Sequence, residues 1–321
     1  MKNFTEAQIL FEDYLAKETF KPSPNNLYDP CRHIMAIGGK RIRPVCVLMA
    51  NELYAPITED ALHAASAIEL FHNFTLIHDD IMDNAPLRRG KQTVHEKWNM
   101  PTAILSGDVM NVYAYQHLAK VHPKYLQAIL QVFNTTAIEV CEGQQMDMDF
   151  EQRDDVSIVE YIHMITLKTS VLLAAALKIG AILGGATDSA SNMIYEFGKN
   201  IGISFQLKDD YLDAYGSAEK IGKQIGGDIL SNKKTYLYLK AKEKANAQQA
   251  TMLQELQHYT GTDKVEKTLD LFNQLDIQAD TQQAKEHYSA LAFDCLDKLP
   301  VQDSRKQELK TLAEYLLERE K

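Results

Sequence analysis

Two short stretches of the sequence concentrate carboxylates within apolar surroundings. The first is LIHDDIMDNAPLRRG at residues 76–90, and the second is FQLKDDYLD at residues 205–213. Both contain the pattern D-D-x-x-D, whose members are Asp79, Asp80, Asp83, Asp209, Asp210 and Asp213. On a helix, the first and last aspartate of each motif lie one turn apart on one face, where like charges repel. One copy is typical of a solvated helix face, whereas two copies facing each other predict a wall of carboxylates that needs cations.

The type of ligand predicts the type of cation. Carboxylate oxygens that leave coordination positions open favour Mg²⁺, which keeps several waters and takes phosphate oxygens from a substrate. The histidines are dispersed and form no H-E-x-x-H pair, so zinc is not expected.

Basic residues accompany the first acidic motif in an otherwise acidic chain. The formal net charge is −10, yet GGKRIRP at residues 38–44 and LRRG at residues 87–90 concentrate positive charge. These basic residues are Lys40, Arg41, Arg43, Arg88 and Arg89. Arginine matches phosphate geometry, and although each cluster alone could serve surface solubility, together with the carboxylates they predict a polyphosphate substrate.

His72 shares a helix face with the first motif. Its spacing to Asp79 and Asp83, of seven and then four residues, keeps the three within about 40° at 100° per residue. A histidine that only packs in the core is the alternative, but the alignment favours a role in the anion site.

The elements that must position these residues are helices. Apolar stripes at helical spacing run through residues 61–83, 102–120 and 125–148, and no strand pattern stands out. No linker-like stretch interrupts the chain. We therefore expect an all-α protein of ten or more helices forming a single domain over residues 1–321.

Composition excludes several classes of protein. An acidic chain with a pI near 5.5 is not expected to bind nucleic acid. The absence of a run of about 18 apolar residues predicts no membrane span. Four cysteines without C-x-x-C spacing are typical of buried thiols in a reducing compartment, so a cytoplasmic location is expected.

Taken together, the motifs resemble those of the all-trans polyprenyl (isoprenyl) diphosphate synthases of short-chain type. Besides the stretches above, the resemblance rests on EGQQMD at 142–147, KTS at 168–170 and GKQIGGDILSNKKT at 222–235, in the family's order. It covers most of the chain. It implies the isoprenoid synthase fold, a helical bundle around a deep central cavity, and a homodimer. It also implies joining of isopentenyl diphosphate, head to tail, to an allylic diphosphate of C5 to C15.

The resemblance also assigns roles to residues. Asp79 and Asp83 with Asp80 in support, and Asp209 with Asp210 and Asp213 nearby, would bind three Mg²⁺ through the allylic diphosphate. The residues that would neutralise the departing diphosphate are Arg88, Lys168, Lys223 and Lys233. Thr169 and Gln206 would present oxygen dipoles to the allylic cation. The site for isopentenyl diphosphate would be formed by Lys40, Arg43, His72 and Arg89, while Arg41 is left without a definite role. EGQQMDMD, which includes Asp147 and Asp149, would line the cavity, with Gln144 supporting a carboxylate and the role of Asp147 open.

Residues just before the first motif would set the product length. In the family, bulky side chains there floor the hydrophobic tunnel; here they are Phe71, Phe74 and Thr75. Phe74 suggests a short product. The lack of a two-residue insertion in the first motif, and a non-aromatic Thr75, favour geranylgeranyl diphosphate (C20) over farnesyl diphosphate (C15). A longer-chain product is a further alternative, and packing of Phe74 against a neighbouring helix is the alternative for that residue.

Other functions fit the sequence less well. A terpene cyclase or a head-to-head synthase would share the fold, but cyclases usually lack a complete second D-D-x-x-D. A non-catalytic subunit of a hetero-oligomeric prenyl synthase typically loses acidic motifs, whereas this chain has both. A structural or cation-buffering helical protein would not need arginines beside its carboxylates.

Overall fold

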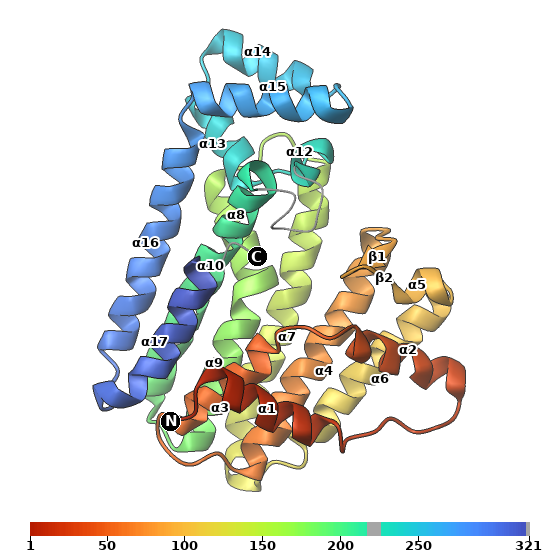
Figure 1. Cartoon of the computed structure of the whole chain (residues 1–321), viewed down its shortest axis with the longest axis vertical. Coiled ribbons are helices and arrows are strands. Elements are labelled where there is room, and N and C mark those ends of the chain that lie inside the picture. The colour runs from red at the N-terminus through yellow and green to blue at the C-terminus, as the bar shows by residue number, and fades with distance from the viewer. Residues whose placement is uncertain (217–225, 319–321) are drawn as a thin grey trace. The chain divides into compact units, whose positions relative to one another are not determined.

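The computed structural model describes residues 1–216 and 226–318, in which the regular structure is almost entirely helical (Figure 1). The helices are α1 (Phe4–Leu15), α2 (Asn25–Ile37), α3 (Ile42–Glu52), α4 (Glu59–Met82), α5 (Val94–Lys97), α6 (Met100–Leu118), α7 (Pro123–Glu151), α8 (Ile158–Ile165), the π-helical turn η1 (Thr166–Ser170), α9 (Val171–Gly184), α10 (Asp188–Tyr215), α12 (Gly227–Leu230), α13 (Tyr236–Lys244), α14 (Ala247–Leu256), α15 (Gly261–Gln274), α16 (Ile277–Asp297) and α17 (Asp303–Glu318). A short antiparallel hairpin joins β1 (Leu87–Arg88) to β2 (Lys91–Gln92). The predicted all-α class with ten or more helices is confirmed.

The described residues form two compact units. Unit 1 comprises residues 1–133, 175–192 and 300–309, and unit 2 comprises residues 134–174, 193–299 and 310–318. The first acidic motif and the arginine clusters belong to unit 1, and the second acidic motif belongs to unit 2. A single domain over residues 1–321 stays a prediction.

Unit 1 is organised around α4, whose alanine-rich first half is buried on most sides. Ala64, Ala65 and Ala67 are fully buried, and α4 packs against α3 and α6. Glycines allow close helix contacts in this unit. A Cβ atom at Gly107 of α6 would lie 2.4 Å from the Nε2 atom of His78, and one at Gly180 of α9 would lie 2.1 Å from the main-chain oxygen of Val47. The end of α4 that carries the acidic motif is therefore fixed by its neighbours.

Both acidic motifs lie at the C-terminal end of a helix. Asp83 caps α4, where its N–H donates to the oxygen of Asp79 at 2.8 Å, and Asp213 lies in the last turn of α10. The helix macrodipole is negative at this end and disfavours carboxylates. Helix geometry thus adds to the mutual repulsion of the aspartates and increases the benefit of a bound cation.

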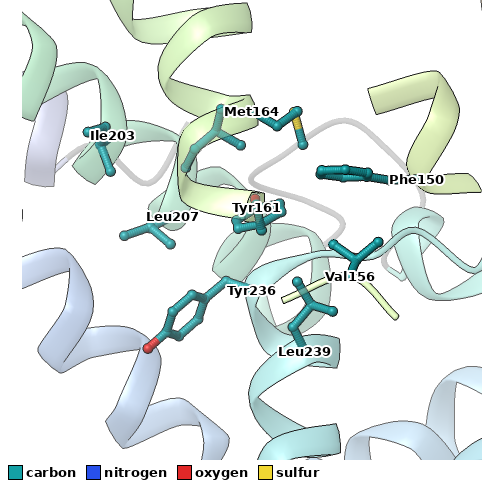
Figure 2. Packing of buried hydrophobic residues seen from close by; sticks show 9 residues of the cluster. Phe150, Val156, Tyr161, Met164, Ile203, Leu207, Tyr236 and Leu239 are labelled. Atoms are coloured by element: carbon teal, nitrogen blue, oxygen red, sulfur yellow. The ribbon is translucent and has the colours of Figure 1, made fainter. Parts of the chain in front are cut away.

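The core of unit 2 joins α7, α8, α10 and α13. Figure 2 shows its side chains, which include Phe150, Tyr161, Leu207 and Leu239. Fully burying a side chain such as Leu207 contributes about 2 kcal/mol. From this core, the hydroxyl of Tyr161 donates a hydrogen bond to Asp210 of the second acidic motif.

The K-T-S segment lies in a widened helical turn. Residues Thr166–Ser170 form η1, and the Oγ atom of Ser170 donates to the main-chain oxygen of Ile165 at 3.3 Å. Glycines face this turn from two helices: Cβ atoms at Gly143 of α7 and Gly202 of α10 would lie 2.3 Å from the nitrogen of Lys168 and 2.6 Å from the Cβ of Ser170. Such π-turns are frequent at functional sites.

One expectation stays a prediction and another needs correction. The stretch Ile158–Gly184 has the length and apolar composition of a membrane span, although charged residues interrupt it. Its most apolar 18-residue window has a mean hydropathy of 1.6, and 72% of this window is buried inside the structure, as in a core helix. The absence of a span stays a prediction. Of the cysteines, Cys31 and Cys46 are buried as expected, but Cys141 is exposed, because it lies on the solvent side of α7.

Candidate active site

A β-hairpin positions the two arginines that follow the first acidic motif. Arg89 and Gly90 form its turn with φ values of 50° and 74°, as a type I′ turn requires. Asparagine usually takes the first of these positions. An arginine there costs conformational free energy, and such costs are typical of residues whose side chain has a function. A Cβ atom on Gly39 would lie 2.5 Å from the Nη1 atom of Arg89. The missing side chain of Gly39 therefore makes room for the Arg89 guanidinium beside the G-G-K-R loop.

Arg43 and His72 are in direct contact. The Nη1 atom of Arg43 lies 3.3 Å from the Nε2 atom of His72, and a guanidinium can only donate, so Nε2 accepts and the ring is neutral. Burial, followed by the charges of the neighbouring arginines, holds the pKa of His72 well below its usual 6.5. The arginines that act on it are Arg43, Arg89, Arg88 and Arg41. Burial lowers the pKa of Arg43 and of Arg89 as well.

Arg41 forms an ion pair with the buried carboxylate of this cluster. Glu69, which is 3% exposed, accepts hydrogen bonds from Nη1 of Arg41 and from Nδ2 of Asn73. The Nη2 atom of Arg41 donates to the oxygen of Met35 at 2.9 Å. With Glu69 engaged in this way, the field around Arg43, His72 and Arg89 is strongly positive and suits a polyanion.

The aspartates of the first motif divide into two roles. Asp80 is buried and accepts from Arg88 through Nε, at 3.0 Å to both carboxylate oxygens, and through Nη2 at 2.8 Å. Asp79 is partly buried and Asp83 is exposed. Arg88 thus holds the middle carboxylate, while solvent reaches Asp79 in part and Asp83 more fully.

In unit 2, a cavity of about 130 Å³ collects several predicted residues. Its walls include Lys168, Thr169, Gln206, Asp210 and Lys233. They also include residues that the sequence did not single out, namely Phe150, Tyr161, Asp228, Lys234 and Thr235.

A chain of hydrogen bonds runs along one wall of this cavity. Thr169 donates to Oε1 of Gln206 at 3.3 Å, and Nε2 of Gln206 donates to Oδ1 of Asp210 at 3.2 Å. The hydroxyl of Tyr161 donates to the other oxygen of Asp210, which the N–H of Tyr236 also approaches at 3.4 Å. Burial raises the pKa of Asp210 to about 7, although the bonds from Tyr161 and Gln206 favour its charged form. The chain fixes the amide of Gln206 with its oxygen toward Thr169.

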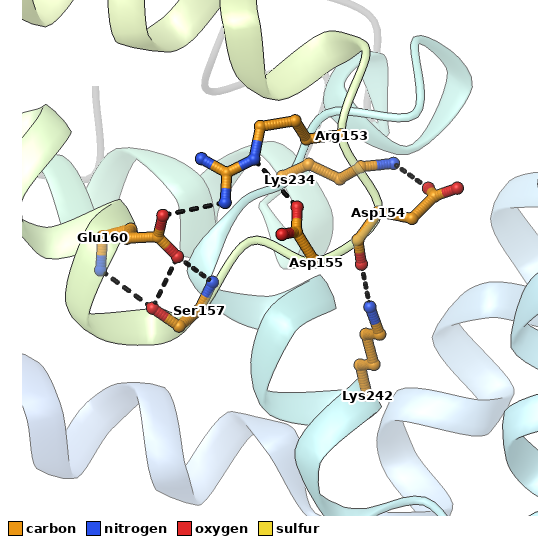
Figure 3. A network of polar contacts seen from close by, with 7 residues as sticks. All are labelled: Arg153, Asp154, Asp155, Ser157, Glu160, Lys234 and Lys242. Atoms are coloured by element: carbon orange, nitrogen blue, oxygen red, sulfur yellow. Dashed lines mark hydrogen bonds and ion pairs between the residues drawn. The ribbon is translucent and has the colours of Figure 1, made fainter.

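The two lysines of N-K-K-T have different partners. Lys233 lies 3.8 Å from a carboxylate oxygen of Asp228, whereas Lys234 pairs with Asp154 at 3.6 Å. Figure 3 shows that Asp154 belongs to a polar network in the loop between α7 and α8, in which Lys242 donates to its main-chain oxygen. Lys234 is therefore tied to this loop, while Lys233 stays beside the acidic residues of the cavity.

The second motif shows the same division as the first. Asp210 is buried and hydrogen-bonded, and one oxygen of Asp213 accepts from the N–H of Asp228 at 3.0 Å, while Asp209 is exposed. Among the described residues, no three acidic, histidine or cysteine side chains gather closely enough to enclose a metal by themselves. Mg²⁺ needs only one or two carboxylates when waters and phosphate oxygens complete its shell. Asp79, Asp83 and Asp209 therefore fit ions that arrive with a diphosphate.

The chain-length residues lie in an aromatic cluster. The ring of Phe74 lies 4.7 Å from that of His78 and 5.5 Å from that of Phe71, measured between centroids, and Phe71 is buried against Phe133. A Cβ on Gly107 of α6 would touch Phe74 at 3.4 Å. Phe74 thus packs against a neighbouring helix, and Thr75 donates to the oxygen of His72 at 2.8 Å. Control of product length by these residues stays a prediction.

The structure thus brings the predicted residues together in two groups. Arg43, His72, Arg88 and Arg89 gather in unit 1, where Lys40 is exposed, and Lys168, Thr169, Gln206 and Lys233 gather in unit 2. Lys223 lies outside the described residues. The sequence did not predict a role for Glu69, although a single carboxylate in a nearly uncharged stretch of helix could have indicated one. Tyr161 was missed because a tyrosine in an apolar stripe looks like core.

These features describe a helical protein in which acidic and basic side chains gather, and the chain is similar to several known proteins. The family model described as polyprenyl synthetase matches residues 24–275. A geranylgeranyl diphosphate synthase of Methanosarcina mazei is 45% identical over 223 residues, which is 69% of each chain. A geranylfarnesyl diphosphate synthase of Natronomonas pharaonis is 37% identical over 74% of this chain and 75% of its own. A crystal structure of a geranylgeranyl pyrophosphate synthase superposes with a TM-score of 0.94 at 43% identity, covering 99% of both chains.

The chain belongs to the polyprenyl synthetase family, as a prenyltransferase of the short-chain isoprenyl diphosphate synthase type.

The neutral state of His72 predicts how stability depends on pH. Its pKa is lower in the folded protein than in the unfolded chain, so the unfolded state binds more protons below about pH 6.5. Stability from this residue is present above pH 6.5 and is lost as the pH falls. Between pH 7 and pH 5 we expect the free energy of unfolding of the wild type, measured with denaturant, to fall by up to about 2 kcal/mol more than that of His72→Gln. Parallel losses in the two proteins would contradict a neutral, buried His72.

Proposed function

We propose that this protein condenses isopentenyl diphosphate with an allylic diphosphate in a Mg²⁺-dependent reaction, and that its main product is geranylgeranyl diphosphate. The observation that carries the diphosphate chemistry is the arginine cluster around neutral His72, beside an acidic motif at a helix end. Such a concentration of positive charge, with Arg43 half-buried and Arg89 exposed, suits a polyanion. The names of the relatives support the C20 product.

The carboxylates of both motifs serve the allylic substrate in this proposal. Asp79, Asp83 and Asp209 would hold the Mg²⁺ ions, which lower the negative charge of the leaving diphosphate. Lys168 and Lys233 add hydrogen bonds to that diphosphate as the C–O bond breaks and its electron pair leaves with oxygen. Thr169 and Gln206 present oxygen dipoles to the resulting allylic cation.

The second substrate would bind in unit 1. Arg43 and Arg89 hold the diphosphate of isopentenyl diphosphate, and neutral His72 can donate through Nδ1 while Nε2 accepts from Arg43. The alkene attacks the allylic cation to form the new C–C bond. The proton then lost passes to the released diphosphate, so the chain needs no dedicated side-chain base.

The direct test is a product assay. The purified protein is incubated with Mg²⁺, labelled isopentenyl diphosphate and a C5, C10 or C15 allylic diphosphate, and the products are sized. We expect elongation of each primer, ending at C20. Failure to elongate any primer would overturn the proposed reaction, and a main product of C15 or of C25 and above would overturn the proposed length. The geranylfarnesyl relative makes C25 the second candidate.

Phe74→Ala is expected to lengthen the product. Removing this ring opens space beside His78 and Gly107, one turn before the acidic motif, in which a longer chain can fit. Product sizing should show a shift from C20 to C25 or longer. Leu76→Ala removes an apolar side chain from the same helix and should keep the wild-type length. An unchanged product from Phe74→Ala would place the chain-length limit elsewhere.

We also propose a homodimer in the cytoplasm. An apolar stripe is exposed on α6, where Leu105 is 59% and Val112 is 55% exposed, and Tyr115 lies one turn further along. Exposed apolar stripes of this kind are typical of subunit interfaces. Sedimentation should give twice the chain mass for the wild type, and Val112→Glu should shift the equilibrium toward the monomer.

A further inference from the structure

Lys168 is held by a carboxylate that has no assigned role. Its Nζ atom lies 2.5 Å from Oδ2 of Asp147 in α7, and the two side chains are each 24% exposed. Both line the cavity of unit 2. The lysine expected to bind diphosphate is thus engaged in a short ion pair within the protein itself.

The protein backbone fixes this pairing. Gly143 lies one turn before Asp147 on the same face of α7, and its Cα approaches the backbone of Lys168 so closely that a Cβ would lie 2.3 Å from the Lys168 nitrogen. Helix α7 and the turn η1 are therefore in van der Waals contact. This contact places the Asp147 carboxylate within reach of the lysine side chain.

The pair differs from the other lysine contacts of the cavity. Lys233 and Lys234 lie 3.8 Å and 3.6 Å from carboxylate oxygens, beyond hydrogen-bond distance, whereas Lys168 and Asp147 are hydrogen-bonded. A diphosphate that enters the cavity therefore has to compete with the Asp147 carboxylate for Lys168.

We propose that Asp147 is a positioning residue that binds Lys168 and competes with diphosphate for it. This inference rests on the proposed function, in which Lys168 binds the leaving diphosphate. Exchange of Lys168 between Asp147 and the anion keeps the released pyrophosphate from being held too tightly. Asp147 also adds negative charge to the cavity wall, which further favours release.

The test is the affinity for inorganic pyrophosphate, measured by calorimetry at fixed Mg²⁺. Asp147→Asn keeps the shape of the side chain but removes the competing charge, so the Kd for pyrophosphate should fall about tenfold. Pyrophosphate should inhibit the variant at correspondingly lower concentrations. A variant that is merely damaged in structure would bind more weakly, so the direction of the change separates the two explanations.

Asp149→Asn is the matched control. It removes the same charge from the same helix two residues later, but Asp149 is exposed and accepts from Gln145 at 2.8 Å, outside the cavity. Its pyrophosphate affinity should equal that of the wild type. In a Lys168→Met background, Asp147→Asn should lose most of its effect, because the competition needs both partners.

The outcomes separate the inference from the function on which it rests. If the wild type binds no pyrophosphate with Mg²⁺, the proposed function and this inference both fail. If the wild type binds but Asp147→Asn binds equally well or more weakly, the inference alone is overturned; weaker binding would mean that Asp147 supports the bound anion. An equal gain from Asp149→Asn would also overturn it, because the effect would be one of general charge.

Discussion

Asp79→Ala is expected to lower kcat/KM for the allylic diphosphate by at least about a thousandfold. Asp79 is the first carboxylate of a motif at the end of α4, and Arg88 occupies its neighbour Asp80, so the Asp80 carboxylate cannot replace it. Losing a metal ligand removes charge stabilisation where the diphosphate departs. Steady-state assays across Mg²⁺ concentrations should show that added metal does not restore the rate.

The same substitution should not destabilise the protein. Asp79 lies beside other carboxylates and near the negative end of the α4 dipole, so without Mg²⁺ its removal relieves repulsion worth about 0.3–1 kcal/mol. Its melting temperature should equal or exceed that of the wild type. Asp13→Ala, which removes an exposed carboxylate of α1, should change neither rate nor stability. An Asp79→Ala enzyme with nearly full activity would show that the metal is bound elsewhere.

Gly143→Ala is expected to destabilise the protein by about 2 kcal/mol or more and to lower kcat about a hundredfold. In a helix interior this change normally stabilises by up to about 1 kcal/mol. Here the added Cβ would lie 2.3 Å from the nitrogen and 2.8 Å from the Cα of Lys168, and backbone atoms cannot move aside as a flexible side chain can. Either α7 or η1 must shift, and a shift of about 1 Å in η1 misplaces Lys168 and Thr169.

Denaturant unfolding and steady-state kinetics would measure the two effects. Glu142→Ala changes the neighbouring exposed residue to the same helix-forming side chain and should stabilise slightly or leave stability unchanged. If Gly143→Ala were as stable as Glu142→Ala, the close contact of α7 with η1 would be wrong.

The sequence by itself determined the helical class and predicted where the chemistry lies. Apolar spacing is a local signal, so the helices that carry residues 61–83 and 125–148 could be predicted without knowledge of their neighbours. The spacing of Asp79 and Asp83 likewise fixed their common face, because i and i+4 positions always coincide on a helix. Residue type then indicated Mg²⁺ and a polyphosphate.

Tertiary structure decided which of these residues are engaged by the protein itself. The pairing of Asp80 with Arg88 depends on a hairpin turn, and the bonds from Tyr161 and Gln206 to Asp210 depend on how α8 packs against α10. Glu69 and Asp147, the partners of Arg41 and Lys168, are 28 and 21 residues away in the chain. Such contacts leave no periodic pattern in the sequence, because they depend on side chains of different elements meeting in space. For that reason the sequence predicted the charged groups, and only the packed structure showed which partners Asp80, Asp210, Arg41 and Lys168 have within the protein.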